Sequence, residues 1–245
     1  MAGKAYIGTS GWIYKHWRDG WYKGIRPKDY LAYDASKFTA LEANGTFYRL
    51  PKRETFEAWA AGTPDKFRFA IKAHRFLTHR KKLKDVGEGI LRQKDAASGL
   101  GSKLAAVVWQ LPANFGCNLE RLEQFLVDLK QWQETRHAIE FRHRSWFVPE
   151  VASLLADNNV AVCMSDAPKW PMWDQVTSDM VYVRLHGHER LYASKYTPEQ
   201  LKSWAIRIQR WLNEEKNVHV YFDNDSHGHA PYDALALLDM VKKRK

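Results

Sequence analysis

The chain has 245 residues, of which 45% are hydrophobic and 27% are charged, so its composition is that of an ordinary soluble globular protein. This length suits one large barrel or two small domains. No apolar run approaches the roughly 18 residues of a membrane span. The start of the chain, MAGKAYIGTSGW, lacks the extended apolar segment of a secretory signal. We therefore expect no membrane association and no export.

The charge and the two cysteines indicate the setting and the partners. The formal net charge of +10 favours anionic partners through long-range attraction. Two basic runs, HRKKLK (79–84) and KKRK (242–245), carry part of this charge, and we interpret them as solvated faces, with contact to nucleic acid as the less favoured alternative. Cys117 and Cys163 form neither a disulfide framework nor a metal cluster, which predicts a reducing, cytoplasmic location.

Short apolar segments alternate with amphipathic ones along the whole chain. The expected strands, in chain order, cover residues 5–10, 40–44, 68–73, 105–111, 137–143, 160–166, 180–187 and 219–225. The expected helices lie near residues 27–37, 53–61, 85–98, 118–132, 149–157, 198–215 and 231–243. Residues 167–179 contain prolines and show no helical period, so a loop is expected after the sixth strand.

Residues 197–212 show the helical pattern clearly. Thr197 can cap the helix, and Pro198 suits its first turn. Leu201, Trp204 and Ile208 then recur at helical spacing.

Eight strands that alternate with about seven helices predict a single (β/α)8 TIM-type barrel over residues 1–245, with one crossover helix replaced by the loop after strand six. The alternative is an open doubly wound sheet, which calls for a glycine-rich phosphate turn after the first strand. The sequence GTSGW at residues 8–12 lacks that G-x-G-x-x-G spacing.

Polar residues gather near the carboxyl ends of the second to eighth expected strands. They are Glu42 and Asn44, Lys72, Gln110, Glu140 and Arg142, Asp166, Arg184 and His186, and Asp223. We place Asp166 on the same strand face as Val162 and Met164. In barrel enzymes this end of the strands carries the active site, so we predict a functional site there. The alternative is a set of buried ion pairs that only fix the packing, such as Glu140 with Arg142 or Arg184, or Asp223 with Lys72.

Seven segments resemble a known family in the same order along the chain. They are GTSGWIYKHW (8–17), EANGTFYRLP (42–51), FAIKAHRFLTH (69–79), QLPANF (110–115), AIEFRHRSWF (138–147), YVRLHG (182–187) and VYFDND (220–225). The chain resembles the YecE-like family, a domain-of-unknown-function group with a TIM-barrel fold. The resemblance implies the barrel but no reaction. The chain departs from the family pattern at Asp223, where asparagine is usual.

The resemblance also implies a shared set of residues. This set is Glu42, Asn44, Phe47, Tyr48, Lys72, His79, Gln110, Glu140, Arg142, His143, Trp146, Arg184, His186, Gly187, Asn224 and Asp225.

The mixture of acidic and basic residues at the strand ends favours an enzyme that performs acid–base chemistry on a small polar substrate with a phosphate or carboxylate group. In this interpretation Lys72, Arg142 and Arg184 bind the anion, and Glu140 acts as general acid or base with His186 or His79 as its partner. The predicted catalytic residues are Glu42, Glu140, His186 and Asp223. The predicted substrate-binding residues are Asn44, Tyr48, Lys72, His79, Gln110, Arg142, His143, Trp146, Asp166, Arg184, Asn224 and Asp225.

Three other functions remain open. A divalent-metal enzyme would use Glu42, Glu140, His186 and Asp223 as ligands, but the arginines argue against it and we assign no metal ligand. A nucleic-acid-binding protein or nuclease fits the net charge and the aromatic residues. A glycoside hydrolase needs two carboxylates, which Glu42 and Glu140 would supply. The sequence specifies no cofactor and no oligomeric state.

One further expectation concerns solvent at the site. We expect Glu140 and Arg142 to form a pair at the wet rim of the barrel. An exposed pair contributes about 0–1 kcal/mol, so replacing Glu140 with glutamine should cost little stability.

Overall fold

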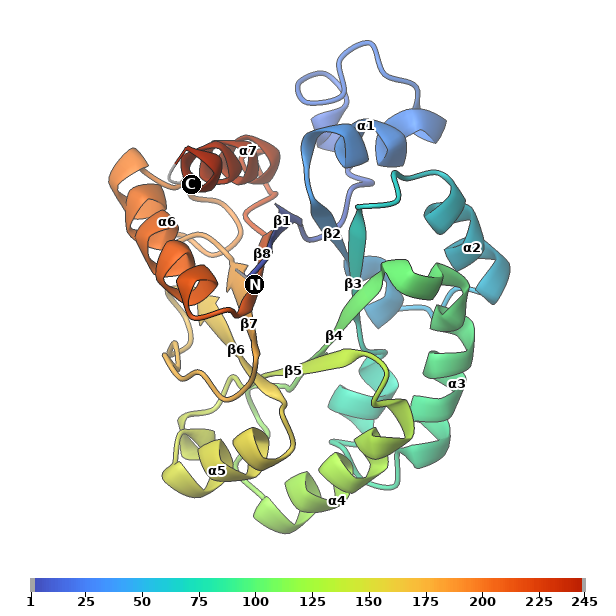
Figure 1. Ribbon diagram of the computed structural model, residues 1–245, viewed down its shortest axis with the longest axis vertical. Coiled ribbons are helices and arrows are strands. Elements are labelled where there is room, and N and C mark those ends of the chain that lie inside the picture. The colour runs from blue at the N-terminus through green and yellow to red at the C-terminus, as the bar shows by residue number, and fades with distance from the viewer. Residues whose placement is uncertain (1–2, 244–245) are drawn as a thin grey trace.

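A computed structural model describes residues 3–243 of the chain. Its eight strands run parallel in one sheet, in which the second to eighth strands pair in sequence order and the eighth pairs with the first (Figure 1). The strands are β1 (Ala5–Thr9), β2 (Ala40–Ala43), β3 (Arg68–Lys72), β4 (Leu104–Gln110), β5 (Arg136–Glu140), β6 (Ala161–Asp166), β7 (Met180–Leu185) and β8 (Asn217–Phe222). A parallel bridge between Ser10 and Glu42 joins β1 to β2 and nearly closes the barrel.

Helices surround the strands on the outside of this barrel (Figure 1). They are α1 (Tyr30–Lys37), α2 (Arg53–Ala61), α3 (Gly87–Ala97), α4 (Leu119–Leu129), α5 (Pro149–Asp157), α6 (Pro198–Asn213) and α7 (Ala230–Lys242). β6 continues to β7 through a loop without a helix, as predicted. The predicted TIM-type barrel is confirmed. Among the helices of residues 3–243, none is long and apolar enough to cross a bilayer.

The α6 helix illustrates how local sequence sets an element. The Thr197 side chain accepts a hydrogen bond from the backbone of Gln200, whose side chain in turn accepts one from the Thr197 backbone. This capping box satisfies backbone donors that the first helical turn leaves free. Leu201, Trp204 and Ile208 are buried on the barrel-facing side, as their spacing predicted.

The interior of the barrel is filled by its own apolar layer, separate from the larger core beneath the helices. β2 to β5 supply mainly small side chains, whereas β7 and β8 supply tyrosines, so large and small residues together fill the space. This layer consists of Ala40, Ala70, Ala106, Val108, Ala138, Ala161, Cys163, Met180, Tyr182 and Tyr221.

The two-residue period of the strands places polar groups above this apolar layer. Successive strand side chains point to opposite faces, so the residue two positions after an inward residue also points inward. The charged and amide side chains placed inward by this rule are Glu42, Lys72, Gln110, Glu140, Arg184 and Asp223. They form the next layer toward the mouth of the barrel.

The same period corrects the prediction for Asp166. Cys163 belongs to the inner layer, whereas Val162 and Met164 belong to the core beneath the helices. Ser165 therefore points inward and Asp166 points toward the helix layer. Asp166 does not join the polar layer, and its Oδ1 lies 3.0 Å from His188 Nδ1.

Candidate functional site

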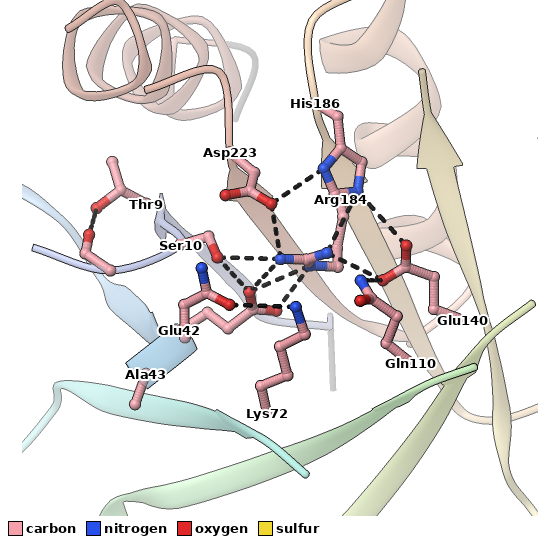
Figure 2. A network of polar contacts seen from close by, with 12 residues as sticks. Thr9, Ser10, Glu42, Ala43, Lys72, Gln110, Glu140, Arg184, His186 and Asp223 are labelled. Carbon is pink, nitrogen blue, oxygen red and sulfur yellow. Dashed lines mark hydrogen bonds and ion pairs between the residues drawn. The ribbon is translucent and has the colours of Figure 1, made fainter. Parts of the chain in front are cut away.

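Arg184 lies at the centre of a buried polar network near the carboxyl ends of the strands (Figure 2). Its Nε donates to both oxygens of Glu42 at 3.1 Å. Its Nη1 donates to Glu140 Oε2 at 2.9 Å and contacts His186 Nε2 at 3.3 Å, and its Nη2 donates to Asp223 Oδ2 at 2.9 Å. A guanidinium has only donors, so each of these carboxylates accepts. The surrounding carboxylates offset the cost of burying the cation.

Glu42 holds one side of this network. Its carboxylate accepts the hydroxyl of Tyr182 at 2.6 Å and the hydroxyl of Ser10, in addition to Arg184. Burial, together with the Glu42 charge, holds the pKa of Tyr182 well above its ordinary value, so this hydroxyl remains a donor. Glu42 is fully buried and has its oxygens occupied.

Glu140 holds the opposite side of the network. Its Oε1 accepts from Arg142 Nε at 2.9 Å, and its Oε2 accepts from Gln110 at 2.8 Å and from Arg184 at 2.9 Å. Burial alone would raise the pKa of this carboxyl, but the guanidiniums of Arg142 and Arg184 hold it well below its usual range. The side chain is 0% exposed. The prediction of a wet rim at Glu140 is therefore wrong.

His186 connects Glu140 to Asp223. Its Nε2 lies 3.3 Å from Arg184 Nη1 and 3.6 Å from Glu140 Oε1, and its Nδ1 lies 3.0 Å from Asp223 Oδ2. Burial would raise the pKa of Asp223, but Arg184 and His186 lower it to about 2. Asp223 therefore pairs with Arg184 and not with Lys72, the partner that the ion-pair alternative named.

Two cationic side chains lie at the edge of the network. Arg142 is 14% exposed, and its guanidinium lies 4.0 Å from the centre of the Trp170 ring. The Nζ of Lys72 lies 4.3 Å from the centre of the Phe47 ring and donates to Asn44 Oδ1 at 3.2 Å. Burial, followed by repulsion from Arg184, lowers the pKa of Lys72 to about 8.

A cavity of about 590 Å³ opens above the network at the mouth of the barrel. Cationic groups, His79 and the carboxylates of Asp223 and Asp225 share its wall. The lining residues are Tyr14, Asn44, Phe47, Tyr48, Lys72, Arg75, His79, Gln110, Arg142, Tyr192, Asp223, Asp225 and Ser226. Glu42, Glu140, Arg184 and His186 are fully buried and lie outside this lining, so they support the floor of the cavity.

Two carboxylates of the wall differ in proton affinity. Burial, together with the negative charge of Asp223, raises the pKa of Asp225 to about 6. Tyr14 lies beside Asp225 and donates its hydroxyl to the backbone oxygen of Ser10 at 2.6 Å. Environments that push two carboxyl pKa values apart are typical of an acid and a base that work together.

Comparison with known proteins places this barrel in a family. A family profile described as "Protein of unknown function DUF72" matches residues 6–245. The chain is a member of the DUF72 family. This confirms the resemblance to a TIM-barrel family of unknown function.

Three similar proteins, two of them solved structures of DUF72 proteins, span nearly the whole chain. The UPF0759 protein YunF of Bacillus subtilis (strain 168) is 25% identical over 273 residues, which cover 96% of this chain and 94% of YunF. A DUF72 protein structure from Thermotoga maritima has 26% identity and a TM-score of 0.86, with 98% of this chain and 99% of that chain covered. One from Enterococcus faecalis has 21% identity and a TM-score of 0.83, with 97% and 95% covered, and shows the shared fold alone.

Two predicted site residues of this DUF72 chain lie outside the cavity lining. Trp146 is fully buried, packs against Phe141 and donates its indole proton to the backbone oxygen of Phe115 at 2.7 Å. His143 contacts the Ser145 hydroxyl at 2.8 Å and caps the short helical turn that carries Trp146. Neither side chain lines the cavity.

Asn224 is also directed away from the cavity. Its Nδ2 donates to the backbone oxygen of Ser194 at 2.9 Å and to Asp233 at 2.8 Å. These bonds tie the end of β8 to the loop after β7 and to α7. Asn224 therefore fixes the position of its neighbours Asp223 and Asp225.

Sequence reasoning missed several residues of the site. Arg75 follows β3 directly, so its place after a strand end could have marked it. Ser10 was also detectable, because it continues the inward period of β1 and donates to Glu42. No sequence pattern marked Tyr192, because it lies in the loop after β7 and lines the cavity only through the conformation of that loop. Its backbone there is left-handed, with φ 61°.

The candidate metal ligands do not form an open site. Glu42, Glu140, His186 and Asp223 surround the guanidinium of Arg184, which occupies the place between them. Across residues 3–243, no group of three or more His, Cys, Asp or Glu side chains is arranged to hold a metal ion. These donors therefore do not fit the alternative in which they bind a divalent metal.

Proposed function

We propose that this DUF72 protein is an enzyme that performs acid–base chemistry on a small polar molecule carrying a carboxylate or phosphate. One observation carries the proposal. In a single cavity at the carboxyl ends of the strands, Lys72, Arg75 and Arg142 share the wall with Asp223 and Asp225. Barrel enzymes place their active sites at this end, and a wall of mixed sign suits an anionic substrate that must also exchange protons.

Arg142 is the group best placed to bind the anion. Its Nε is held by Glu140 and its plane lies against Trp170, so the orientation of the guanidinium is fixed. In the described part of the chain, no protein acceptor within hydrogen-bond distance holds its two Nη groups. A guanidinium that is held in place and has free donors can form the bidentate hydrogen bonds that carboxylates and phosphates accept.

The proton-transfer role moves from Glu140 to the wall of the cavity. Glu140 is fully buried and its oxygens are occupied, so its role is to position Arg142 and Arg184. Asp225, with a pKa of about 6, can donate or accept a proton near neutral pH. The pKa of His79 is lowered to about 4, chiefly by burial and then by Lys72, so its imidazole is a neutral acceptor.

Ligand-induced stabilisation tests this proposal. Thermal unfolding is measured with inorganic phosphate, sulfate and a set of small carboxylates and phosphate esters, because a ligand of the native state raises the unfolding temperature. Arg142→Lys keeps the charge but loses the planar fork, so it should weaken the best ligand by about tenfold, or about 1.4 kcal/mol.

Arg144→Lys is the matched control, because Arg144 lies two residues away, is exposed and does not line the cavity. It should respond to each ligand as the wild type does. If Arg142→Lys and the wild type respond equally to every anion, the cavity does not bind anions through Arg142 and the proposal fails.

A further inference from the structure

We propose that Lys72 is the nucleophile of this site and forms an imine with a carbonyl compound that also bears a carboxylate or phosphate. The proposal rests on the proposed function, because it takes the cavity above β3 as the active site. It goes further by assigning a covalent step and a carbonyl substrate class. The geometry of the lysine amine points to this chemistry.

The surroundings of the Lys72 amine differ from those of a structural lysine. The residue is 6% exposed, and its Nζ lies over the Phe47 ring with one amide oxygen, that of Asn44, as acceptor at 3.2 Å. Within residues 3–243, no carboxylate oxygen lies within 4.0 Å of this nitrogen. By contrast, Lys103 donates to the backbone oxygens of Ala60 and Thr63 at 2.6 Å each.

Arg184 explains why the amine lacks an anionic partner. The nearby carboxylates are directed toward its guanidinium, with Glu42, Glu140 and Asp223 at 2.8–2.9 Å. Lys72 is left buried beside a cation, and burial together with this repulsion disfavours its own positive charge. A lysine that is desolvated or placed next to another cation is the type that forms Schiff bases in enzymes.

The charged surroundings make the neutral amine available near neutral pH. The titratable and charged groups that face Lys72 are Glu42, His79, Glu140, Arg184 and Asp223. Burial and Arg184 outweigh the carboxylates, so the pKa of Lys72 falls to about 8. At about pH 7 such an amine is neutral in roughly one molecule in ten, against fewer than one in a thousand for a lysine of ordinary pKa.

The imine forms on Lys72 by addition of the amine to the carbonyl group followed by loss of water. The lone pair of Nζ adds to the carbonyl carbon, the C=O electron pair moves to oxygen, and transfer of a proton from nitrogen to oxygen gives a carbinolamine. The carbinolamine hydroxyl takes a second proton and leaves as water while the C=N bond forms. Asp225, which lines the same cavity and keeps a proton up to about pH 6, is the acid for this second transfer. The protonated imine then withdraws electrons from the neighbouring carbon.

The cavity wall also carries arginines that can bind the anionic group of such a substrate. Arg75 and Arg142 line the same cavity as Lys72, so an anionic group held there would present a nearby carbonyl to the amine. Holding both reactants in one site raises the rate of addition strongly. The geometry therefore points to a 2-oxo acid or a phosphorylated aldehyde or ketone.

Reductive trapping tests the proposal. The full-length protein is incubated with sodium cyanoborohydride and pyruvate, glyceraldehyde 3-phosphate or acetone, and the alkylated lysines are quantified by peptide mapping. We expect Lys72 to be labelled by an anionic carbonyl at least tenfold faster than Lys103 and the exposed lysines. The rate should pass through a maximum between about pH 6 and about pH 8, because Lys72 must lose its proton while Asp225 keeps one. The α-amino group, which also has a low pKa, is read separately.

Three comparisons decide the outcome. Lys72→Arg should remove this fast label while the protein still unfolds cooperatively, and Arg142→Lys should slow labelling by pyruvate but not by neutral acetone. If none of the three carbonyls labels Lys72 faster than Lys103, Lys72 is not the nucleophile. Anion stabilisation that still depends on Arg142 would then leave the proposed function standing. Equal labelling by acetone and the anions would overturn the substrate class.

Discussion

Replacing Glu140 with glutamine tests whether this carboxylate belongs to the buried support of the site. Glu140 Oε1 accepts from Arg142, and Oε2 accepts from Gln110 and Arg184. The amide of glutamine has one oxygen and one NH₂ group, so either orientation places a donor against another donor. The substitution also removes a charge that two guanidiniums share.

The expected cost follows from burial. Glu140 is 0% exposed, as is Arg184. Breaking a buried pair by changing one partner costs about 3–5 kcal/mol, whereas an exposed pair contributes about 0–1 kcal/mol. A domain of this kind has a total stability of about 5–15 kcal/mol. Glu140→Gln should therefore lose a large part of its stability but still fold.

Urea unfolding at several pH values measures the cost and its origin. The folded pKa of Glu140 lies well below its usual range, so its stabilising contribution is complete above the unfolded pKa, near about 4.3, and is lost as the pH falls through the folded value. The free-energy difference between wild type and Glu140→Gln should be nearly constant from about pH 5 to about pH 8 and shrink at lower pH.

Glu57→Gln is the matched control, because Glu57 pairs with Arg53 at 3.1 Å on the surface of α2 and is 52% exposed. It should cost less than about 1 kcal/mol at every pH. If Glu140→Gln costs no more than Glu57→Gln, water reaches Glu140 and our description of the buried network is wrong.

Two further predictions concern Asp225, a carboxylate of the cavity wall, and the basic end of the chain. The raised pKa of Asp225 means that its stabilising contribution is present below the unfolded pKa, near about 4, and is lost as the pH rises to about 6. Asp225→Asn should remove this loss, so its free energy of unfolding should rise relative to that of the wild type by on the order of 1–2 kcal/mol between about pH 4 and pH 7.5, after allowance for solvent screening. If urea unfolding gives the same difference in free energy between the two proteins at every pH, the prediction is wrong. Deleting the basic run 242–245, of which 244–245 lie outside the described residues, should leave the unfolding temperature and the response to phosphate unchanged. A filter-binding assay that found tight, salt-sensitive and tail-dependent binding of nucleic acid would instead favour a nucleic-acid partner.

The position of the site could be read from the sequence because two simple periods determine it. Strand residues alternate between faces, and the carboxyl ends of parallel strands meet at one mouth. Glu42, Lys72 and Asp223 were placed together by this reasoning, and the structure brings them together around Arg184 and the cavity. The helices and the loop after β6 followed from local signals in the same way.

Asp166 shows where alternation gives no answer. The strand VAVCMSD is apolar at nearly every position because one face meets the barrel interior and the other meets the helices. Because both faces of such a strand are buried and largely apolar, hydrophobic alternation does not distinguish its inward side. Which of its residues point inward is set by the pairing of β6 with β7, in which Ser165 lies beside Arg184.

The sequence by itself determined the barrel, the mouth that gathers the polar residues and the balance of charge there, because these depend on local periods and strand direction. Only the tertiary structure decided which of these residues meet solvent. Glu140 and Arg142 point the same way and are two residues apart, roughly 6–7 Å along a strand. That distance is enough for Glu140 to lie beneath Arg142 in the buried layer while Arg142 lines the cavity. Depth in a barrel depends on strand stagger and on the loops that cover the mouth, which no local pattern records.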